Sequence, residues 1–303
     1  MSVTVTILGS NSALPAHGRH PSAQLLAIGH HHILIDCGEG TQFRFNDLKL
    51  SKMKVENIFI THLHGDHIFG LPGFLTSMIL MDRREPVTII GPEGIQKMME
   101  QIFTATEAHF GFEVRYVETD PSRHYTVFDH PKYTVETIPL HHKIPCNGYL
   151  FREKDHPRNI REDAIEKYRL SPLQIQELKA GKEADTPYGK VRPQDVLYVK
   201  RRAMTYAYCS DTTYFPSIIP IIRGVDLLYH EATYMEDFLV QATQRGHSTA
   251  RQAGKIAREA GVRGLLIGHP SSKYQNVNDL VREARMEYEE AEFAHEGQTY
   301  LLS

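Results

Sequence analysis

The 303-residue sequence has few cysteines and no long apolar segment. Its three cysteines, Cys37, Cys146 and Cys209, are odd in number and far apart, which argues against a disulfide framework and against a Cys-x-x-Cys metal site. No apolar run approaches the roughly 18 residues that a membrane-spanning helix requires. The first residues, Met1–Leu8, alternate without a basic flank, as in a strand and unlike a signal peptide. We therefore expect a cytoplasmic protein with no membrane partner.

The sequence also lacks a large net charge. It has 34 Lys and Arg against 37 Asp and Glu, a net charge of −3, which argues against a general nucleic-acid binder. The charge is unevenly distributed, because residues 152–202 hold 13 basic and 9 acidic residues, a local net charge of +4. The remainder therefore carries −7. A basic segment on an acidic body fits a phosphate-binding appendage, and on charge alone it fits a solvated, partly helical insertion equally well.

Segments with strand and helix character alternate along both halves of the chain, without a repeat period. The expected strands are Val3–Leu8, Gln24–Ile28, His32–Ile35, a strand ending at Ile58–Thr61, Val87–Gly91, Glu113–Val117, Thr134–Ile138, Gly148–Phe151, Met204–Cys209, Leu227–Tyr229, Gly264–Ile267 and Thr299–Leu302. The expected helices are Leu71–Met81, Glu93–Phe103, Thr249–Ala260 and Val277–Glu290. The alternation predicts an α/β or α+β fold with helices outside layered sheets.

One segment departs from this pattern. Between Asp155 and Arg192 the apolar spacing becomes helical, and Pro, Gly and charged residues interrupt it repeatedly. We interpret it as an inserted helical arm. One domain over residues 1–303, with a basic arm inserted at 152–202, fits better than two independent domains.

A short histidine-rich loop carries the strongest chemical signal. The sequence Thr61-His62-Leu63-His64-Gly65-Asp66-His67 places four potential metal ligands within six positions, directly after a strand. Because His62 and His64 are two residues apart, they project the same way from an extended segment and can hold one metal ion. Asp66 and His67 can reach a second ion in the following turn. Histidine nitrogen together with carboxylate oxygen suits Zn²⁺ and other borderline divalent metals.

Further candidate ligands follow other expected strands. Asp211 lies just after Met204–Cys209 and can bridge two ions, and His269 follows Gly264–Ile267 and can complete the second site. His142 or His141, after the strand that ends near Pro139, can complete the first site. Ligands from several strand ends can converge on one edge of a sheet.

These motifs together resemble a known family. His-x-His-x-Asp-His resembles the signature of the metallo-β-lactamase superfamily, and other segments narrow the resemblance to the ribonuclease Z family. Those segments are Leu34–Gln42, Gly91-Pro92-Glu93-Gly94, Ser210-Asp211-Thr212, His230-Glu231-Ala232-Thr233, His247-Ser248-Thr249 and Gly268–Tyr274. The similarity runs from Val3 to Leu302 and is interrupted mainly by the basic stretch.

The resemblance implies a four-layer αββα fold, in which two packed mixed sheets are flanked by helices. It also implies a zinc-dependent endoribonuclease that removes the 3′ trailer of precursor tRNA by hydroxide attack on a phosphodiester and leaves a 3′-hydroxyl. The family has a His followed by Pro three positions later and Gly-Tyr at six and seven. His142 fits that spacing and His141 does not, so His142 is the expected ligand.

The implied site holds two Zn²⁺ ions per subunit, with Mn²⁺ or Co²⁺ as alternatives and no organic cofactor. The expected metal ligands are His62, His64, Asp66, His67, His142, Asp211 and His269. We expect Asp66 to orient or deprotonate the attacking water as well. His247 is the expected proton donor to the leaving oxygen, and Glu231 is expected to hold the His247 imidazole in the required tautomer.

Two residues are expected to contact the substrate. Ser271 and Lys273 are candidate phosphate contacts, although Lys273 stands where the family usually has Arg and so lacks the planar fork suited to phosphate. The basic arm is the expected tRNA-binding exosite, but it lacks a Gly-Pro signature common in this family. The resemblance further implies a homodimer.

Two alternative functions stay open: a thioesterase or lactamase of the same fold, and a zinc-stabilised RNA-binding protein without catalysis.

Overall fold

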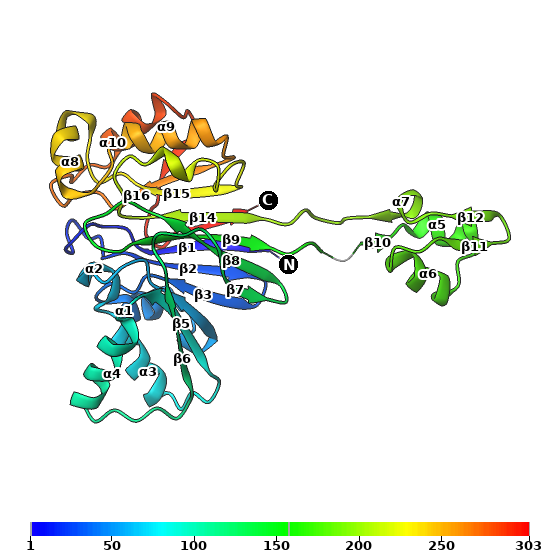
Figure 1. Ribbon diagram of the computed structural model, residues 1–303, viewed down its shortest axis with the longest axis horizontal. Helices are drawn as coiled ribbons and strands as arrows, with labels where there is room; N and C mark the ends of the chain where they lie inside the picture. Colours follow the sequence, from blue (N-terminus) through cyan, green and yellow to red (C-terminus); the bar gives the residue numbers. More distant parts are fainter. Residues whose placement is uncertain (1, 157, 303) are drawn as a thin grey trace. The chain divides into compact units, whose positions relative to one another are not determined.

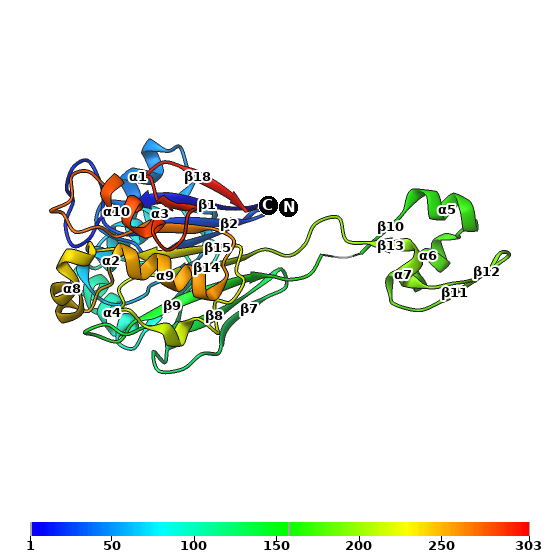
Figure 2. The same ribbon diagram turned by 90° about the horizontal axis from the view of Figure 1, so that it is seen from above.

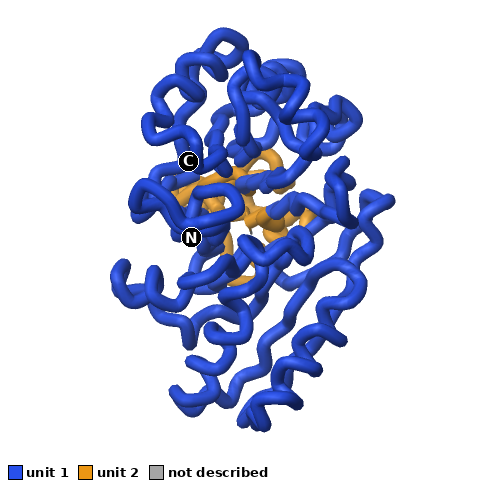
Figure 3. The backbone as a smooth tube through the Cα atoms, turned by 90° about the vertical axis from the view of Figure 1, so that its left-hand side faces the viewer, with its two compact units in different colours: residues 1–152, 204–303 blue, residues 153–203 orange. Residues whose placement is uncertain are grey.

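The computed structural model describes residues 2–156 and 158–302, which form two compact units. Unit 1 comprises residues 1–152 and 204–303 and unit 2 comprises residues 153–203, coloured blue and orange in Figure 3. The bounds of unit 2 differ by one residue at each end from those of the arm expected at 152–202. None of the helices in the described part of the chain has the length and apolar character that a bilayer span needs.

The first sheet of unit 1 has seven strands and is mixed. Its strands, in order across the sheet, are β18 (Thr299–Leu302), β1 (Val3–Gly9), β2 (Ala23–Ile28), β3 (His31–Ile35), β4 (Val55–Phe59), β5 (Val87–Pro92) and β6 (Val114–Thr119). The pairs from β18 to β3 are antiparallel, and those from β3 to β6 are parallel. The parallel half places the carboxyl ends of β3, β4 and β5 at the same edge.

The second sheet also has seven strands. Its strands, in order, are β17 (Ala291–Phe293), β16 (Leu265–Gly268), β15 (Leu227–Glu231), β14 (Thr205–Cys209), β9 (Asn147–Glu153), β8 (Tyr133–Pro139) and β7 (Thr126–His130). Strands β14 to β17 run parallel, whereas β9 pairs with β14 and β7 with β8 in antiparallel fashion. The chain enters unit 2 at the end of β9 and leaves it before β14.

Helices cover the outer faces of both sheets (Figures 1 and 2). The helices of unit 1 are α1 (Thr41–Asp47), α2 (Gly65–Ile68), α3 (Leu71–Leu80), α4 (Ile95–Ala105), α8 (Leu239–Arg245), α9 (Ala250–Ala260) and α10 (Asn278–Arg285), with short 3₁₀ turns η1 (Lys52–Lys54), η2 (Pro216–Ile218) and η3 (Glu236–Phe238). Buried side chains of α1, α3 and α4 form one apolar core with the first sheet, and those of α9 and α10 form another with the second. The expected four-layer αββα architecture is therefore confirmed.

A third core joins the two sheets and is rich in aromatic side chains. Tyr149, Phe151, Tyr206, Tyr208 and Tyr229 are all at most 1% exposed in it. The rings of Tyr208 and Tyr229 stack with their centroids 4.8 Å apart. Each fully buried aromatic side chain contributes about 1.5–3 kcal/mol. This core fixes the spacing of the sheets and hence of the loops at their edges.

Helix α9 illustrates how the sequence specifies an outer layer. The side chain of Thr249 accepts a hydrogen bond from the backbone nitrogen of Gln252, and the Gln252 side chain returns one to the Thr249 backbone, a capping box that starts the helix. Gly261 ends it at a φ of 60°. Between them, Ala250, Ala253, Ile256, Ala257 and Ala260 recur at helical spacing and are buried against the second sheet.

Unit 2 is small and contains both helices and strands. Its elements are β10 (Asn159–Ile160), α5 (Glu162–Tyr168), α6 (Pro172–Lys179), β11 (Ala184–Thr186), β12 (Gly189–Val191), α7 (Pro193–Val196) and β13 (Leu197–Tyr198). Strand β10 pairs with β13, and β11 with β12. The expected helical character is present in α5 and α6. The short strands were not expected, because two- and three-residue strands carry too little periodicity to be recognised.

Candidate metal centre

The candidate ligands follow the carboxyl ends of strands from both sheets. Strand β4 leads into the histidine-rich loop, and β8 leads to His142. Asp211 and His269 follow β14 and β16, which run parallel on either side of β15. Because the carboxyl ends of parallel strands meet at one edge of a sheet, residues far apart in the sequence lie together there.

One donor set consists of His62, His64, His142 and Asp211. The Nε2 atoms of His62 and His142 lie 3.5 and 3.6 Å from Asp211 Oδ2. The Nδ1 atom of His64 lies 3.0 Å from His62 Nε2 and 3.3 Å from His142 Nε2. His141 lies outside this set, and its Nδ1 instead contacts the Thr213 hydroxyl at 2.8 Å. The structure therefore places His142, the histidine that the family spacing selects, in this donor set.

A second donor set consists of Asp66, His67 and His269, with Asp211 beside them. The Nε2 atoms of His67 and His269 lie 3.6 and 3.5 Å from Asp66 Oδ2. The same two nitrogens lie 3.5 and 3.2 Å from Asp211 Oδ1. Asp211 therefore presents Oδ2 to the first set and Oδ1 to the second, as a bridging carboxylate does.

The spacing of these donors fits tetrahedral zinc. Ligand atoms at about 2.0–2.1 Å from a tetrahedral ion lie about 3.3–3.4 Å from one another. The donor–donor distances given above run from 3.0 Å, between His62 and His64, to 3.6 Å, and all donors of a set lie within 4.8 Å of one another. Histidine nitrogen and carboxylate oxygen suit Zn²⁺ and also other borderline divalent ions, so the geometry fits a metal without selecting among these.

Hydrogen bonds on the far side of each ring assign the tautomers in the second set. His67 Nδ1 lies 2.8 Å from Asp36 Oδ2 and must donate to it, so in the neutral ring Nε2 carries a lone pair. His269 Nδ1 lies 3.1 Å from the hydroxyl of Thr233, which itself donates to Glu231 at 2.5 Å. With both rings neutral, two Nε2 lone pairs would face each other at 3.2 Å. A proton or a metal cation between them relieves this repulsion, and a metal ion would be coordinated by both nitrogens.

The first set follows the same logic. His142 Nδ1 donates to the carbonyl of Gly246 at 2.8 Å, which leaves a lone pair on Nε2. His62 Nδ1 lies 3.0 Å from the hydroxyl of Thr61, which itself donates to Asp36. Each of these rings therefore aims a lone pair at the same point, and the outer hydrogen bonds hold the rings in place.

Charge also favours a cation at this position. Asp211 is 2% exposed, and burial raises its pKa, but the neighbouring histidines, His269 first, outweigh burial and hold that pKa well below its usual value. Burial lowers the pKa of His67, but carboxylates, chiefly Asp211 and Asp36, outweigh it and raise the pKa to about 10. In the protein alone a proton thus supplies the positive charge that these buried carboxylates require. A metal ion would supply it instead.

Local backbone strain marks the same strand ends. Asp36 and His269 follow β3 and β16 directly, and Asp211 lies two residues after the end of β14; their φ angles are 55°, 59° and 55°. This left-handed conformation costs a non-glycine residue about 1–3 kcal/mol, and such residues cluster at functional sites. The turn redirects each side chain toward the donors immediately after the strand ends.

Asp36 organises the loop that carries the first ligands. Its carboxylate accepts hydrogen bonds from the backbone nitrogen of Thr61 at 2.8 Å, from His67 at 2.8 Å and from the hydroxyl of Tyr208 at 2.9 Å. Through the contact with His67, Asp36 supports a candidate ligand histidine from behind.

His247 and Glu231 form a buried pair beside the donor sets. His247 Nδ1 lies 2.9 Å from Glu231 Oε1, and Glu231 also accepts from the backbone nitrogens of Thr212 and Thr233. Burial lowers the pKa of His247, but the Glu231 carboxylate outweighs it and raises the pKa to about 9. His247 could also ligate a metal, because it groups with Asp211 and His269 within 4.8 Å.

A polar pocket of about 660 Å³ opens onto both donor sets. Several residues that the sequence did not single out line it, namely Ser12, Ala13, Pro21, Phe69, Lys143 and Arg245. No short motif identifies them, because they come from separate loops that only the folded chain brings together. Ser271 and Lys273 are not among the described lining residues. The Lys273 ammonium instead lies over the rings of Phe238, Tyr274 and Tyr234.

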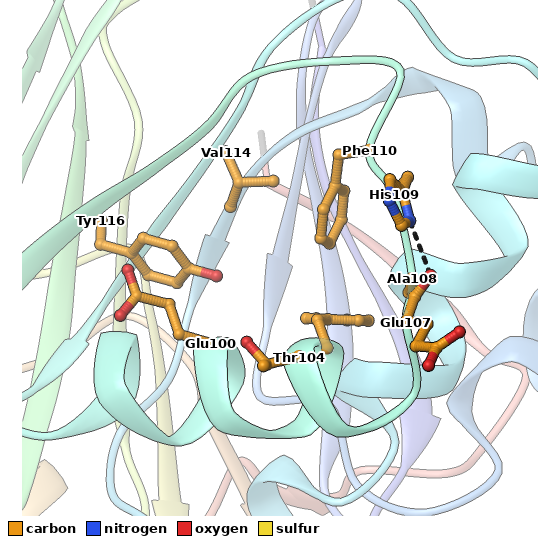
Figure 4. Close-up of a pocket in the computed structure, with 9 residues that line it drawn as sticks. Glu100, Thr104, Glu107, Ala108, His109, Phe110, Val114 and Tyr116 are labelled. Carbon is orange, nitrogen blue, oxygen red and sulfur yellow. Dashed lines mark hydrogen bonds between the residues drawn. The ribbon is translucent and has the colours of Figure 1, made fainter.

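A second hollow, of about 570 Å³, lies between α4 and β6 (Figure 4). Phe103, Phe110, Val114 and Tyr116 give it a largely apolar lining. Its histidine, His109, bonds the carbonyl of Glu107 at 2.6 Å. The described residues that line it include none of the grouped metal donors, so the polar pocket is the candidate site for hydrolysis.

Comparisons with known proteins agree on the architecture. Residues 3–154 match the family model described as Anti-Pycsar protein Apyc1, a stretch that contains every candidate ligand up to His142. The crystal structure of the human tRNase Z short form superposes with a TM-score of 0.72 at 23% identity, over 99% of each chain. The metallo-β-lactamase fold protein YhfI of Bacillus subtilis superposes with a TM-score of 0.70 at 19% identity, over 99% of this chain and 100% of its own. The expected metallo-β-lactamase fold is thus confirmed.

One relative is similar in sequence over nearly the whole chain. The ribonuclease Z of Porphyromonas gingivalis strain ATCC 33277 is 43% identical over 283 residues, which cover 93% of each chain. Two chains this similar over this length share a common fold and descent. The match extends beyond the donor sets to the remainder of the molecule.

Proposed function

This chain belongs to the ribonuclease Z family of endoribonucleases, and on that premise we propose that it removes the 3′ trailer of precursor tRNA by hydrolysing one phosphodiester bond. The observation that carries the proposal is the pair of donor sets joined by Asp211, whose two oxygens face different sets at 3.2–3.6 Å. Two ions held about 3.5–4 Å apart stabilise both the attacking and the leaving oxygen of an in-line displacement. Two sets that share one carboxylate suit that spacing.

The ions are Zn²⁺ in this proposal, although Mn²⁺ or Co²⁺ would satisfy the same donors. His62, His64, His142 and Asp211 would hold the first ion, and Asp66, His67, His269 and Asp211 the second. Bound zinc supplies an activated water near neutral pH and neutralises charge on the phosphoryl oxygens. The protein contributes the ring orientations, which Asp36, Thr233 and the carbonyl of Gly246 fix from behind.

Asp66 positions the attacking water in this mechanism. Its side chain is 12% exposed and lines the pocket, and Oδ2 is held by the backbone nitrogen of Ala13 at 2.9 Å. Burial raises the pKa of Asp66, but His67 and His269 outweigh it and hold that pKa well below its usual value, so the carboxylate stays ionised and orients a water by accepting its hydrogen bond. Water, and not the neighbouring ribose 2′-hydroxyl, attacks phosphorus on the side opposite the 3′ oxygen. The bond between phosphorus and the 3′ oxygen therefore breaks, the trailer leaves with a 5′-phosphate and the tRNA keeps a 3′-hydroxyl.

His247 supplies the proton that the leaving 3′ oxygen requires. Its Nδ1 proton is committed to Glu231, so Nε2 carries the second proton. A pKa of about 9 keeps the ring protonated at neutral pH. General-acid assistance of this kind contributes about 10²–10⁴-fold to a rate.

Unit 2 is proposed as the tRNA-binding exosite. Ten of its twelve Lys and Arg side chains are exposed, as phosphate contacts require. Contacts of this kind position an RNA without reading its sequence. The homodimer and the cytoplasmic location expected from the sequence stay predictions.

The test is to incubate the purified zinc-loaded protein with a 3′-extended precursor tRNA and to map the product ends at nucleotide resolution. We expect one cut just after the unpaired 3′ discriminator nucleotide, a 3′-hydroxyl on the tRNA, and loss of the cut in Asp66→Ala. A cut elsewhere, or a 2′,3′-cyclic end, would contradict the proposal.

Two other outcomes would identify the alternatives. Hydrolysis of a thioester without hydrolysis of any phosphodiester would assign the chain to carbonyl chemistry on the same fold. A metal-loaded protein that binds tRNA and hydrolyses neither substrate would be a binding protein without catalysis.

A further inference from the structure

An exposed aromatic ring stands in the wall of the polar pocket. Phe69 is 62% exposed and lines the pocket together with the candidate ligands His64, Asp66 and His269. It directly follows α2, the short helix that carries Asp66 and His67. Its position is therefore fixed by the same loop that fixes the donors.

The ring of Phe69 lies close against the backbone of Gly65. A Cβ atom at residue 65 would come within 2.4 Å of the ring carbon Cε2 and 2.6 Å of Cδ2. Only glycine permits this approach. The ring thus rests against the ligand loop with much of its surface open to the pocket, and it does not belong to the buried apolar clusters of the described residues.

Other residues in the same lining carry positive charge. Lys143 follows the ligand His142, and Arg245 comes one residue before Gly246, whose carbonyl orients His142. The Arg245 guanidinium donates to the hydroxyl of Tyr234 at 3.1 Å, which restricts its position. Cations that neutralise phosphates beside an exposed aromatic ring are the combination that binds single-stranded nucleic acid.

Resting on the proposed function, we propose that Phe69 is the stacking platform for the nucleobase adjacent to the scissile phosphate. The RNA strand must be unpaired at the scissile phosphate for that phosphate to reach two ions in a pocket. A neighbouring base is therefore free to stack. Stacking accepts every base because each has a π-face. Phe69 therefore holds the strand in register without reading its sequence.

The test is a coupling experiment between protein and RNA. We would measure kcat/KM of wild type and Phe69→Leu on precursor tRNA and on two variants, each with an abasic ribose on one side of the cut. Loss of one stacked base costs about 5- to 150-fold, from the free energies typical of base–aromatic stacking. We expect this loss in Phe69→Leu and, in wild type, at one of the two abasic positions, with no further loss when the two are combined.

Two variants serve as controls. Phe69→Tyr keeps an aromatic face and should retain activity, while Phe43→Leu changes a ring that is equally exposed, at 63%, but does not line the pocket. Phe43→Leu should leave kcat/KM unchanged. Full metal content in Phe69→Leu would show that the loop still holds its ligands.

A separate binding experiment distinguishes failure of this proposal from failure of the proposed function. A short single-stranded RNA carrying 2-aminopurine loses fluorescence when that base stacks, whether or not precursor tRNA is cleaved. Quenching by wild type but not by Phe69→Leu would support the platform even if no tRNA were cut. Cleavage of precursor tRNA with additive losses at both abasic positions would overturn the platform and leave the proposed function standing.

Discussion

The two units of the molecule differ in where they place charged side chains. Unit 1 buries charge: Asp36, Asp211 and Glu231 are at most 2% exposed, and each is held by several hydrogen bonds or ion pairs. Unit 2, apart from the buried Glu153 at its start, holds its charge at the surface over a small core formed by Ala164, Leu170, Leu178, Ala184, Val191 and Val196. Buried, fixed charge is what bond cleavage needs, whereas exposed, mobile charge suits contacts with an RNA backbone.

The largest effect is expected for Asp211→Ala, because this change removes a ligand from both donor sets at once. Metal ions supply several kcal/mol of charge stabilisation, so we expect a loss of about 10³-fold or more on precursor tRNA and on a small aryl phosphodiester alike. Metal bound per chain should fall in parallel, measured by atomic emission. Asp47→Ala, at an exposed position on α1, is the control. Normal cleavage by Asp211→Ala would show that Asp211 does not bridge the two metal sites.

The next largest effect is expected for His247→Ala, and it should depend on the leaving group. We expect about a 10²–10⁴-fold loss on RNA, because the ribose 3′ oxygen requires a proton. An aryl phosphodiester releases a stable phenolate and should lose much less. Metal content should be unchanged, measured on the same preparation. A parallel loss of metal and of both activities would instead make His247 a ligand.

The pH dependence sharpens the same assignment. The pKa of His247 is raised from 6.5 to about 9, so its proton favours the folded state fully below pH 6.5, and that contribution disappears as the pH rises through 9. If His247 is the proton donor, the rate of RNA cleavage should fall at high pH, where His247 loses its proton. Bound cations lower the pKa of His247, which places this descending limb of the pH–rate profile at or below about pH 9. Glu231→Gln should shift the limb to lower pH, and an unshifted limb would contradict the pairing.

The smallest effect is expected from the surface of unit 2. Replacing Lys179, Lys182 and Lys190 by Gln should weaken tRNA binding modestly and should leave hydrolysis of an aryl phosphodiester unchanged. The slope of log affinity against log salt should become shallower by about 0.7–0.9 for each lost phosphate contact. The matched control replaces three exposed lysines of unit 1, Lys49, Lys97 and Lys132. Equal slopes in the two triple variants would argue against the exosite.

Much of unit 1 was predictable because its strands are regular and end in chemically distinctive residues. The expected strand at Thr134–Ile138 corresponds to β8, and the expected helix at Leu71–Met81 corresponds to α3 within one residue. Helix α1 and strand β7 were not expected. Helix α1 starts after a glycine in the left-handed region, Gly40, without a side-chain cap, and β7 has only intermediate or exposed residues. Neither has a sequence signal that differs from a loop.

The donor sets were predictable for a different reason from the pocket wall. Histidine and aspartate directly after strands carry their own chemical signal, and parallel strands bring them to one edge. Phe69, Lys143 and Arg245 are ordinary surface residues in sequence, and only the folded loops place them in one lining. Lys273 was a candidate phosphate contact from the family resemblance, and that role stays a prediction. Its ammonium lies over three aromatic rings, a position that the sequence did not indicate.

The most direct test of the division between the units is to remove unit 2. Arg152 of β9 pairs with Thr205 of β14, so Asn-Gly in place of residues 153–203, followed by Met204, can join the two strands as a three-residue hairpin loop. We would measure kcat/KM on precursor tRNA and on an aryl phosphodiester side by side. We expect kcat/KM for the aryl phosphodiester to be unchanged and kcat/KM for precursor tRNA to fall because KM rises. Unchanged tRNA cleavage, with the aryl phosphodiesterase intact, would contradict this division.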